Sequence, residues 1–273
     1  MISKPPLNFL GNKNKFKDTL MNMFKNYSDD YIFVDLFGGS GYLSYIAKQT
    51  CKNNTVIYND YDYYSDRIAH IEETQLILDE IKTMVINANI LPEQKLNKEL
   101  SDEIKKMLKD RENKEGYVDW ITISNQLCFT MNTCHNYEEF NKMTLYNNLN
   151  KSKLQPNSDY LDGIDIVHMD WKVLYKKYKH DKNIVWLIDP PYPNTLVQQY
   201  KDNISNNDSL KLLNILHDKD NVYYFTSSRS NMLEVYKWKY GTEDNLKITK
   251  NINGSGRYRS YYDYCLYKNK FNV

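Results

Sequence analysis

Residues 184–192 read Ile-Val-Trp-Leu-Ile-Asp-Pro-Pro-Tyr, an unbroken apolar run that stops at an aspartate and two prolines. The apolar run predicts a buried strand of an α/β fold. The prolines end that strand, because proline has no amide hydrogen with which to continue a sheet. Open α/β sheets bind their ligands at the carboxyl ends of the strands. This stretch therefore predicts both the fold class and the position of the site.

The residues that close this strand suit a substrate that carries an amine on a flat ring. The carboxylate of Asp189 and the carbonyl of Pro190 can each accept one N–H bond from the amine, and the rings of Pro190 and Pro191 fix the direction of that carbonyl. Tyr192 offers a face on which the flat ring can stack. The alternative is a strand followed by an ordinary proline turn, since Asp-Pro is common in turns.

A second strand and turn stand near the N-terminus, where residues 32–41 read Ile-Phe-Val-Asp-Leu-Phe-Gly-Gly-Ser-Gly. Glycines let the backbone approach a ligand closely, and the start of the following helix presents unpaired N–H groups. The third glycine of the dinucleotide pattern is missing, which disfavours a nicotinamide cofactor. Asp35 and Phe37 are compatible with a nucleoside that carries an amino-acid tail. A plain strand-to-helix turn is the alternative.

Two further segments of the N-terminal third carry candidate binding residues. The strand expected at 55–58 ends in Asn59-Asp60, and an acid at this position is placed to bind ribose hydroxyls. A tight turn over 7–13 delivers Lys13 near the start of a helix. The alternatives are an acid that caps its strand and a solvated lysine.

The strand expected at 164–168 ends in Met169-Asp170-Trp171. Asp170 can accept a bond from an adenine amine, while Met169 and Trp171 can pack on the faces of the ring. A plain strand end is the alternative here as well.

The middle of the chain contains no predicted buried strand between residues 60 and 164. A gap of this length in an α/β pattern predicts an inserted helical subdomain over 66–160, with 1–65 and 161–273 forming the main domain. Helical spacing of apolar residues predicts helices over 71–85, 93–113 and 117–129, and a further helical stretch that ends near 149.

The chain beyond Tyr192 continues with a polar loop over 194–207, which is typical of a lid or a substrate clamp. A helix over 210–216 and a strand over 222–228 follow. Two alternating runs, 246–252 and 258–267, are joined by Asn-Gly-Ser-Gly and predict a C-terminal β-hairpin.

The bulk composition is typical of a soluble protein, with 41% hydrophobic and 26% charged residues in 273. The formal net charge of +1 neither indicates nor excludes nucleic-acid binding, because a local basic face matters more than the total. Four cysteines without a C-x-x-C pair favour reduced thiols in a cytoplasm over a metal site. No stretch approaches the roughly 20 apolar residues of a membrane span.

Taken in order, the motifs resemble those of the Dam-type (class alpha) adenine-N6 DNA methyltransferases of bacteria and phages. The resemblance rests on Gly11-Asn12-Lys13, on residues 35–41, on Asn59-Asp60 and on Asp189-Pro190-Pro191-Tyr192. It implies a Rossmann-like sheet, S-adenosylmethionine as cofactor, double-stranded DNA as partner, and an insert that recognises the target sequence. The target adenine must leave the duplex, because its amine is otherwise out of reach of a buried methyl donor.

The motifs and the resemblance together assign a role to each candidate residue. Catalysis is assigned to Asp189, Pro190, Pro191 and Tyr192. The cofactor pocket is assigned to Phe9, Gly11, Lys13, Asp35, Phe37, Gly38, Gly39, Ser40, Gly41, Asn59, Asp60, Met169, Asp170, Trp171 and Asp189. DNA contacts are assigned to Asn132, Lys142, Lys151, Lys153, Arg257 and Arg259, although solvated lysines and a charged hairpin end are the alternatives there.

The insert departs from the family members that read GATC. Those members carry a hairpin with arginine and glycine, whereas residues 132–149 contain neither. Arginine is the usual reader of guanine, so a different adenine-containing target is expected. The remaining alternatives are methylation of cytosine N4 in DNA, methylation of adenine in RNA, and a catalytically inactive nucleic-acid-binding relative. A cognate restriction enzyme is a candidate partner, and a monomer or weak dimer is expected.

Overall fold

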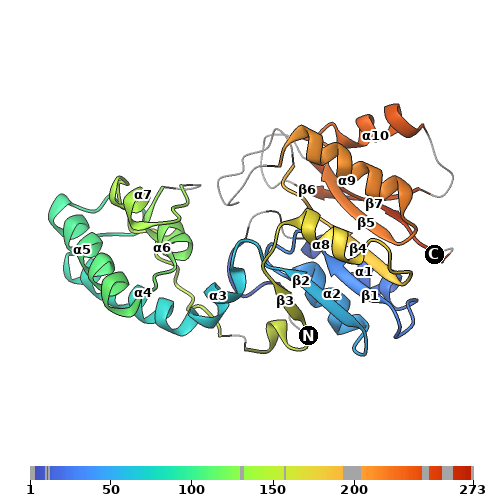
Figure 1. Ribbon diagram of the computed structural model, residues 1–273. Helices are drawn as coiled ribbons and strands as arrows, with labels where there is room; N and C mark the ends of the chain where they lie inside the picture. The colour runs from blue at the N-terminus through green and yellow to red at the C-terminus, as the bar shows by residue number, and fades with distance from the viewer. Residues whose placement is uncertain are drawn as a thin grey trace. The chain divides into compact units, whose positions relative to one another are not determined.

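The chain forms two compact units (Figure 1). The core unit comprises Met1–Pro5, Phe9–Tyr64 and Asp159–Val273, and the insert unit comprises Pro6–Asn8 and Ser65–Ser158. The computed structural model describes residues 4–9, 11, 13–129, 132–156, 158–192, 204–241, 246–253 and 261–271. Most of the loop predicted over 194–207 lies outside these described residues.

The core unit is built on a seven-stranded sheet with the order β3-β2-β1-β4-β5-β7-β6. The first five strands of this order are parallel, and β7 runs antiparallel to both of its neighbours. The strands are β1 (Ile32–Asp35), β2 (Thr55–Asn59), β3 (Asp165–Val167), β4 (Ile184–Ile188), β5 (Val222–Ser227), β6 (Lys247–Asn253) and β7 (Tyr261–Lys268). The prediction of an α/β methyltransferase-like sheet that ends in a β-hairpin is confirmed.

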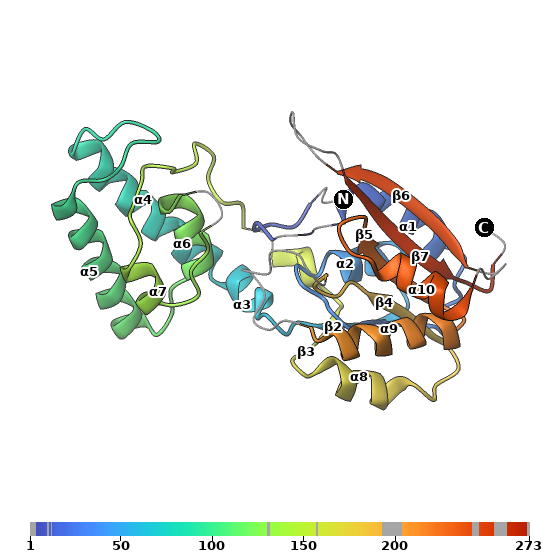
Figure 2. The ribbon, with the colours of Figure 1, turned by 90° about the horizontal axis from the view of Figure 1, so that it is seen from above.

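Helices cover both faces of this sheet (Figure 2). One layer holds α8 (Trp171–Tyr178), α9 (Asn206–Asp218) and α10 (Met232–Tyr240), and the other holds α1 (Lys17–Phe24) and α2 (Tyr42–Thr50). Because both faces are covered, all five residues of β4 are buried, as its continuous apolar run predicts. The predicted helix over 210–216 begins earlier, at Asn206, because Ser205 caps it by accepting a bond from the amide of Asp208.

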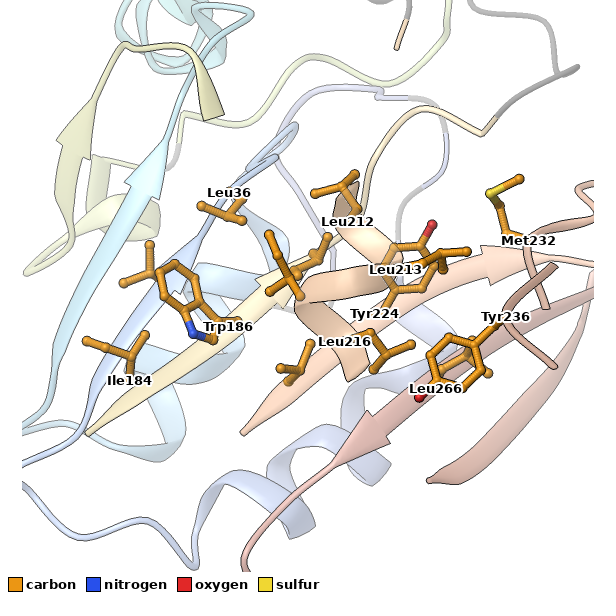
Figure 3. Packing of buried hydrophobic residues seen from close by; sticks show 14 of the residues in the cluster. Leu36, Ile184, Trp186, Leu212, Leu213, Leu216, Tyr224, Met232, Tyr236 and Leu266 are labelled. Carbon is orange, nitrogen blue, oxygen red and sulfur yellow. The ribbon is translucent and has the colours of Figure 1, made fainter. Parts of the chain in front are cut away.

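The core between the sheet and the first helical layer contains Trp186 of β4, Tyr224 of β5 and Leu266 of β7 (Figure 3). Leu212, Leu213 and Leu216 of α9 pack against these side chains. This packing fixes the strand ends on which the site residues stand. The same packing leaves the carboxyl ends of β1 and β4 side by side, since Asp35 pairs with Leu187 in the parallel register.

The insert unit is helical, with its own hydrophobic core. Its helices are α4 (Ile71–Asn87), α5 (Lys98–Glu115), α6 (Trp120–Leu127) and α7 (Tyr137–Asn141). The first residue of α3 (Tyr64–Ala69) belongs to the core unit and the rest of that helix to the insert unit. The expected start at residue 93 is wrong, because the Asn97 side chain caps α5 at the amide of Leu100. The expected helix up to residue 149 is also wrong. The chain after α7 is extended there, and Leu145 and Tyr146 form isolated bridges with Cys128 and Lys95.

None of the helices in the described part of the chain is both long and apolar enough to span a membrane.

Candidate active site

The site lies where two neighbouring strands end. Gly38, Gly39 and Ser40 follow β1, and Asp189 follows β4, so that the parallel pairing brings the two turns together. The cleft between them is open to solvent. It is lined by Phe9, Gly11, Lys13, Phe37, Gly38, Gly39, Ser40, Tyr42, Leu43 and Asp189.

Asp189 has a charged or polar partner on each of its carboxylate oxygens. The ammonium of Lys13 lies 2.6 Å from Oδ2, and the hydroxyl of Tyr192 donates to Oδ1 over 3.2 Å. Lys13 is 4% exposed, and its ammonium also donates to the carbonyl of Gly11. The same ammonium lies 5.5 Å from the centre of the Tyr192 ring. The predicted tight turn thus delivers Lys13 to the end of β4 rather than to solvent.

Burial and charge act in opposite directions on the Asp189 carboxyl. Burial raises its pKa above the ordinary value, while the Lys13 charge and the hydrogen bonds from Lys13 and Tyr192 lower it. Burial is the larger effect, so the net shift of the pKa is upward. A carboxylate in this environment keeps its charge mainly because Lys13 is present.

In the glycine turn after β1, the backbone packs closely against the ring of Tyr58. A Cβ on Gly38 would lie 2.1 Å from two carbons of the Tyr58 ring, so no larger residue fits there. The Tyr58 hydroxyl donates to the carbonyl of Gly39 over 2.7 Å, and the Tyr160 hydroxyl donates to the carbonyl of Ser40 over 3.0 Å. These two tyrosines orient the turn, and no sequence pattern indicates either role.

Asp35 lies beneath this turn and is fully buried. Its Oδ2 accepts a 2.8 Å bond from the hydroxyl of Ser44, whereas its Oδ1 has no hydrogen-bond partner among the described residues. Burial raises its pKa to about 7, the Ser44 hydrogen bond opposes that shift, and the nearby charge of Asp189 adds to it. An unsatisfied buried carboxylate oxygen is costly and marks a place where a cationic or donor group is favoured.

The side chains of Asn59 and Asp60 form hydrogen bonds with residues near the ends of the strands. The Asn59 amide donates to the carbonyls of Leu36 and Met169 and accepts from the amide of Met169. Asp60 is fully buried, and its Oδ1 accepts bonds from the amide of Tyr64 and the hydroxyl of Tyr58. Neither residue lines the cleft, so the ribose-binding role of Asp60 stays a prediction.

The residues that follow β3 also lie outside the lining of the cleft. Asp170 caps α8, accepting a 2.7 Å bond from the amide of Lys172. The ring of Trp171 packs against that of Phe37, with centroids 5.7 Å apart. Through this contact, the end of β3 supports a side chain that does line the cleft.

The structure therefore brings together part of the predicted cofactor set. Lining the cleft are Phe9, Gly11, Lys13, Phe37, Gly38, Gly39, Ser40 and Asp189. Away from its lining are Asp35, Gly41, Asn59, Asp60, Met169, Asp170 and Trp171. Tyr42 and Leu43, at the start of the helix that follows the glycine turn, also line it, and the motifs do not indicate either residue.

The predicted DNA-contacting residues of the insert unit are all exposed. Lys151 and Lys153 line a second cleft between α4 and the segment 149–154, together with Lys82. That segment is held down by two glutamines, since Gln126 accepts from the amide of Asn150 and Gln75 from that of Leu154. Asn132 and Lys142 lie elsewhere on the surface of this unit, and Arg257 and Arg259 lie outside the described residues.

The core cleft fits S-adenosylmethionine, the cofactor that the motifs imply. That molecule carries a cationic sulfonium and ammonium, a carboxylate and a flat adenine ring. The carboxylate of Asp189 suits the cationic groups, Lys13 suits the carboxylate, and the ring of Phe9, which a Cβ on Gly39 would approach to 2.9 Å, suits the adenine. Across the described segments, no group of three or more metal-ligating side chains occurs.

Comparison with known proteins agrees with this chemistry. A family model described as "D12 class N6 adenine-specific DNA methyltransferase" matches residues 9–254. A Haemophilus influenzae protein named "Putative methyltransferase" is 28% identical over 260 residues, which cover 92% of this chain and 85% of that protein. The family model spans far more than half of the chain. The chain therefore belongs to the D12 class of N6 adenine-specific DNA methyltransferases, whose members act on DNA and use S-adenosylmethionine as methyl donor.

Proposed function

We propose that this chain is a Dam-type enzyme of bacterial or phage origin that methylates adenine directly on N6, within a specific DNA sequence. The observation that carries the proposal is the position of Asp189. Its carboxylate stands at the end of β4, in the cleft formed with the glycine turn, and it is buried beside the Lys13 ammonium. A carboxylate placed in this way can hold an amine against a methyl donor bound in the same cleft.

Asp189, Pro190 and Tyr192 each position a different part of the target base. Asp189 and the carbonyl of Pro190 accept hydrogen bonds from the two N–H groups of the adenine amine and so direct its lone pair. N6 loses one of these two protons when it gains the methyl group. Tyr192 stacks on the base and holds it in plane. S-adenosylmethionine supplies the methyl group from its sulfonium when bound. Most of the acceleration comes from this positioning, which needs no covalent intermediate with the protein.

Lys13 has to release one oxygen of Asp189 before the adenine amine can bind there. Oδ2 holds the ammonium at 2.6 Å, and Oδ1 holds the Tyr192 hydroxyl. The ammonium then needs another anionic partner, because an unpaired buried charge is strongly unfavourable.

We assign target recognition to the insert of residues 66–160 and methyl transfer to residues 1–65 and 161–273. The support for the insert is its exposed lysines, of which Lys151 and Lys153 border a polar cleft. Lysines at such positions can neutralise phosphates, which gives affinity without sequence choice. Asn132, Lys142, Arg257 and Arg259 are assigned further DNA contacts.

The target is proposed to differ from GATC, because residues 132–149 contain no arginine to read guanine. A cognate restriction enzyme as partner, a monomer or weak dimer in solution, and a cytoplasmic location are the accompanying proposals. The cytoplasmic location is supported by the free thiols of the four cysteines.

The test is transfer of label from S-adenosylmethionine to unmethylated genomic DNA, followed by nucleoside analysis. Wild type is compared with Asp189→Ala and with Asp181→Ala, which changes an exposed aspartate shortly before β4. We expect label in N6-methyladenine for wild type and Asp181→Ala, and none for Asp189→Ala. Label in N4-methylcytosine would contradict the proposal that adenine is the target base. Label that appears only when RNA is supplied would contradict the proposal that DNA is the substrate.

A further inference from the structure

The segment that carries Lys13 is fastened across the C-terminal half of the sheet. Phe16 packs edge-on against Phe225 of β5, with centroids 5.5 Å apart. The amide side chain of Asn251 on β6 donates to the carbonyl of Lys15 over 3.1 Å, and the Lys15 ammonium donates to the carbonyl of Ile252 over 2.6 Å. Contacts with β5 and β6 therefore determine where the segment that carries Lys13 is held.

A second buried carboxylate, Asp263 of β7, lies on the same face of these strands. Asp263 pairs with Ser227 of β5, and Cys265 pairs with Phe225. Because directly opposed residues share a face and positions two apart along a strand do so too, Asp263 and Phe225 point to the same side. The Lys13 ammonium lies over the Phe225 ring, 5.6 Å from its centre. Asp263 is only 8% exposed.

The charges around Asp263 link it to the active site. Burial raises its pKa, the charge of Lys13 is the largest opposing influence, and Lys15 and Arg229 also lower the pKa. The charge of Asp189 raises it. The charge of Lys13 therefore acts on two carboxylates, Asp189 at the end of β4 and Asp263 near the start of β7.

The reaction creates a need for this second acid. When the adenine amine takes Oδ2 of Asp189, the Lys13 ammonium loses its 2.6 Å partner. At 4% exposure it cannot turn to water, and an unpaired buried charge is strongly unfavourable. We propose that Asp263 is a positioning residue, which retains the Lys13 ammonium on the β5–β7 face and so frees Asp189 to hold the amine of the target base. This inference rests on the proposed role of Asp189.

The first test needs neither cofactor nor DNA. Thermal unfolding of the unliganded protein is measured for wild type, Asp263→Asn, Lys13→Gln and the double variant. We expect each single change to lower the melting temperature by several degrees, and the double variant to melt no lower than the less stable single variant, because the two charges stabilise each other. Additive losses would overturn the coupling. If Asp263→Asn does not fold, recovery of folding in the double variant supports the inference, and its failure to recover refutes it.

The second test separates positioning from simple stability. Steady-state methylation over a range of pH is compared for wild type, Asp263→Asn, Asp263→Glu and the control Asp165→Asn, an exposed acid on β3. We expect Asp263→Asn to lower kcat about tenfold with a KM for S-adenosylmethionine within about threefold of wild type, a pattern of impaired chemistry rather than impaired binding. We expect Asp263→Glu to recover most of that loss and Asp165→Asn to match wild type. The acid limb of kcat should move to lower pH in Asp263→Asn, because the negative charges of Asp189 and Asp263 repel each other and removal of one lowers the pKa of the other.

A wild-type kcat and an unmoved pH limb in Asp263→Asn would overturn the inference while leaving the proposed function intact. A wild-type protein that methylates no nucleic acid would instead overturn the proposed function. The melting temperatures of the single and double variants would still decide whether Lys13 and Asp263 are coupled.

Discussion

The ammonium nitrogen of Lys13 lies 2.6 Å from Oδ2 of Asp189, in a pair whose side chains are only 4% and 18% exposed. A pair on the surface would contribute little, but removing one member of a buried pair leaves the other charge uncompensated. If Asp189 has the catalytic role proposed above, the resting protein stabilises that carboxylate with a lysine that the substrate has to displace. One ion pair would then serve both stability and catalysis.

Replacing Asp189 with asparagine should separate these two roles. The new side chain would keep one acceptor oxygen but lack the charge, so we expect kcat to fall by about 100-fold or more, the effect of removing one well-placed electrostatic interaction. The unpaired Lys13 should also lower stability by roughly 3 kcal/mol. Single-turnover methylation and urea denaturation measure the two effects.

Tyr192→Phe is the matched control for the Asp189 change, because it removes the 3.2 Å bond from the hydroxyl to Oδ1 and keeps the ring. We expect its kcat to fall about tenfold, less than in Asp189→Asn, since a hydrogen bond to a charged group contributes roughly 1.5 kcal/mol or more. A loss as large as that of Asp189→Asn would mean that the hydroxyl, rather than the ring, is what the site requires.

Gly38→Ala tests whether the close approach of the turn to Tyr58 matters. The new methyl group would meet the Tyr58 ring at 2.1 Å and the carbonyl of Asn59 at 2.9 Å, so the turn has to move. We expect a loss of roughly 1–3 kcal/mol in unfolding free energy, the usual effect of overpacking, together with loss of S-adenosylmethionine binding in calorimetry.

Gly116→Ala is the comparison for Gly38→Ala. Gly116 has φ +80° but open space around its position, so the substitution adds backbone strain without a clash. We expect it to lower stability by about 1 kcal/mol and to leave cofactor binding unchanged. Equal binding by the two variants would show that the Gly38 backbone does not shape the cofactor cleft.

Asp35 should make the stability of the protein depend on pH. Its pKa is raised from 3.8 to about 7 in the folded chain, chiefly by burial. The folded state therefore holds the proton more tightly than the unfolded chain does. The contribution of the protonated Asp35 carboxyl to the unfolding free energy is fully present below pH 3.8 and is lost as the pH rises to about 7. This loss is on the order of 4 kcal/mol.

Asp35→Asn removes this titration while keeping an oxygen that can accept the Ser44 hydroxyl. We expect the variant to gain stability relative to wild type as the pH rises from 5 to 8, measured by urea denaturation at each pH. Comparison at each pH cancels the titration of Asp189, which is shifted in the same direction. A difference between the two proteins that is constant with pH would contradict the prediction.

The parts of the site that the sequence predicts are those set by strong local patterns. The apolar run that ends at Asp189 predicts β4, because a strand buried on both faces has to be apolar throughout. The apolar segment before Gly38 predicts β1 in the same way. That the two turns meet follows from parallel pairing, which places the carboxyl ends of both strands at one edge of the sheet.

The parts that the sequence does not predict depend on contacts between distant residues. The hydroxyls of Tyr58 and Tyr160 reach the glycine turn from 19 and 120 residues away, and no spacing rule connects them to it. Asp60 fits the ribose-binding pattern by position, yet its Oδ1 accepts the amide of Tyr64, four residues ahead. A pattern fixes the residue type at a strand end, but competing donors decide what the side chain binds.

The lysines of the insert unit should determine how DNA affinity depends on salt. Lys151 and Lys153 are exposed beside the cleft at α4, and Lys153 is also 2.9 Å from Asp79. We expect Lys151→Met/Lys153→Met to weaken DNA binding on every sequence alike and to reduce the slope of log K against log salt by about one for each phosphate that is no longer neutralised. S-adenosylmethionine binding should not change.

The control Lys98→Met/Lys114→Met removes two exposed lysines from the two ends of α5 in the same unit, and it should keep the wild-type slope. Fluorescence anisotropy with duplexes of different sequence over a range of salt measures all three proteins, and equal slopes for the two double variants would refute a phosphate-binding role for this cleft.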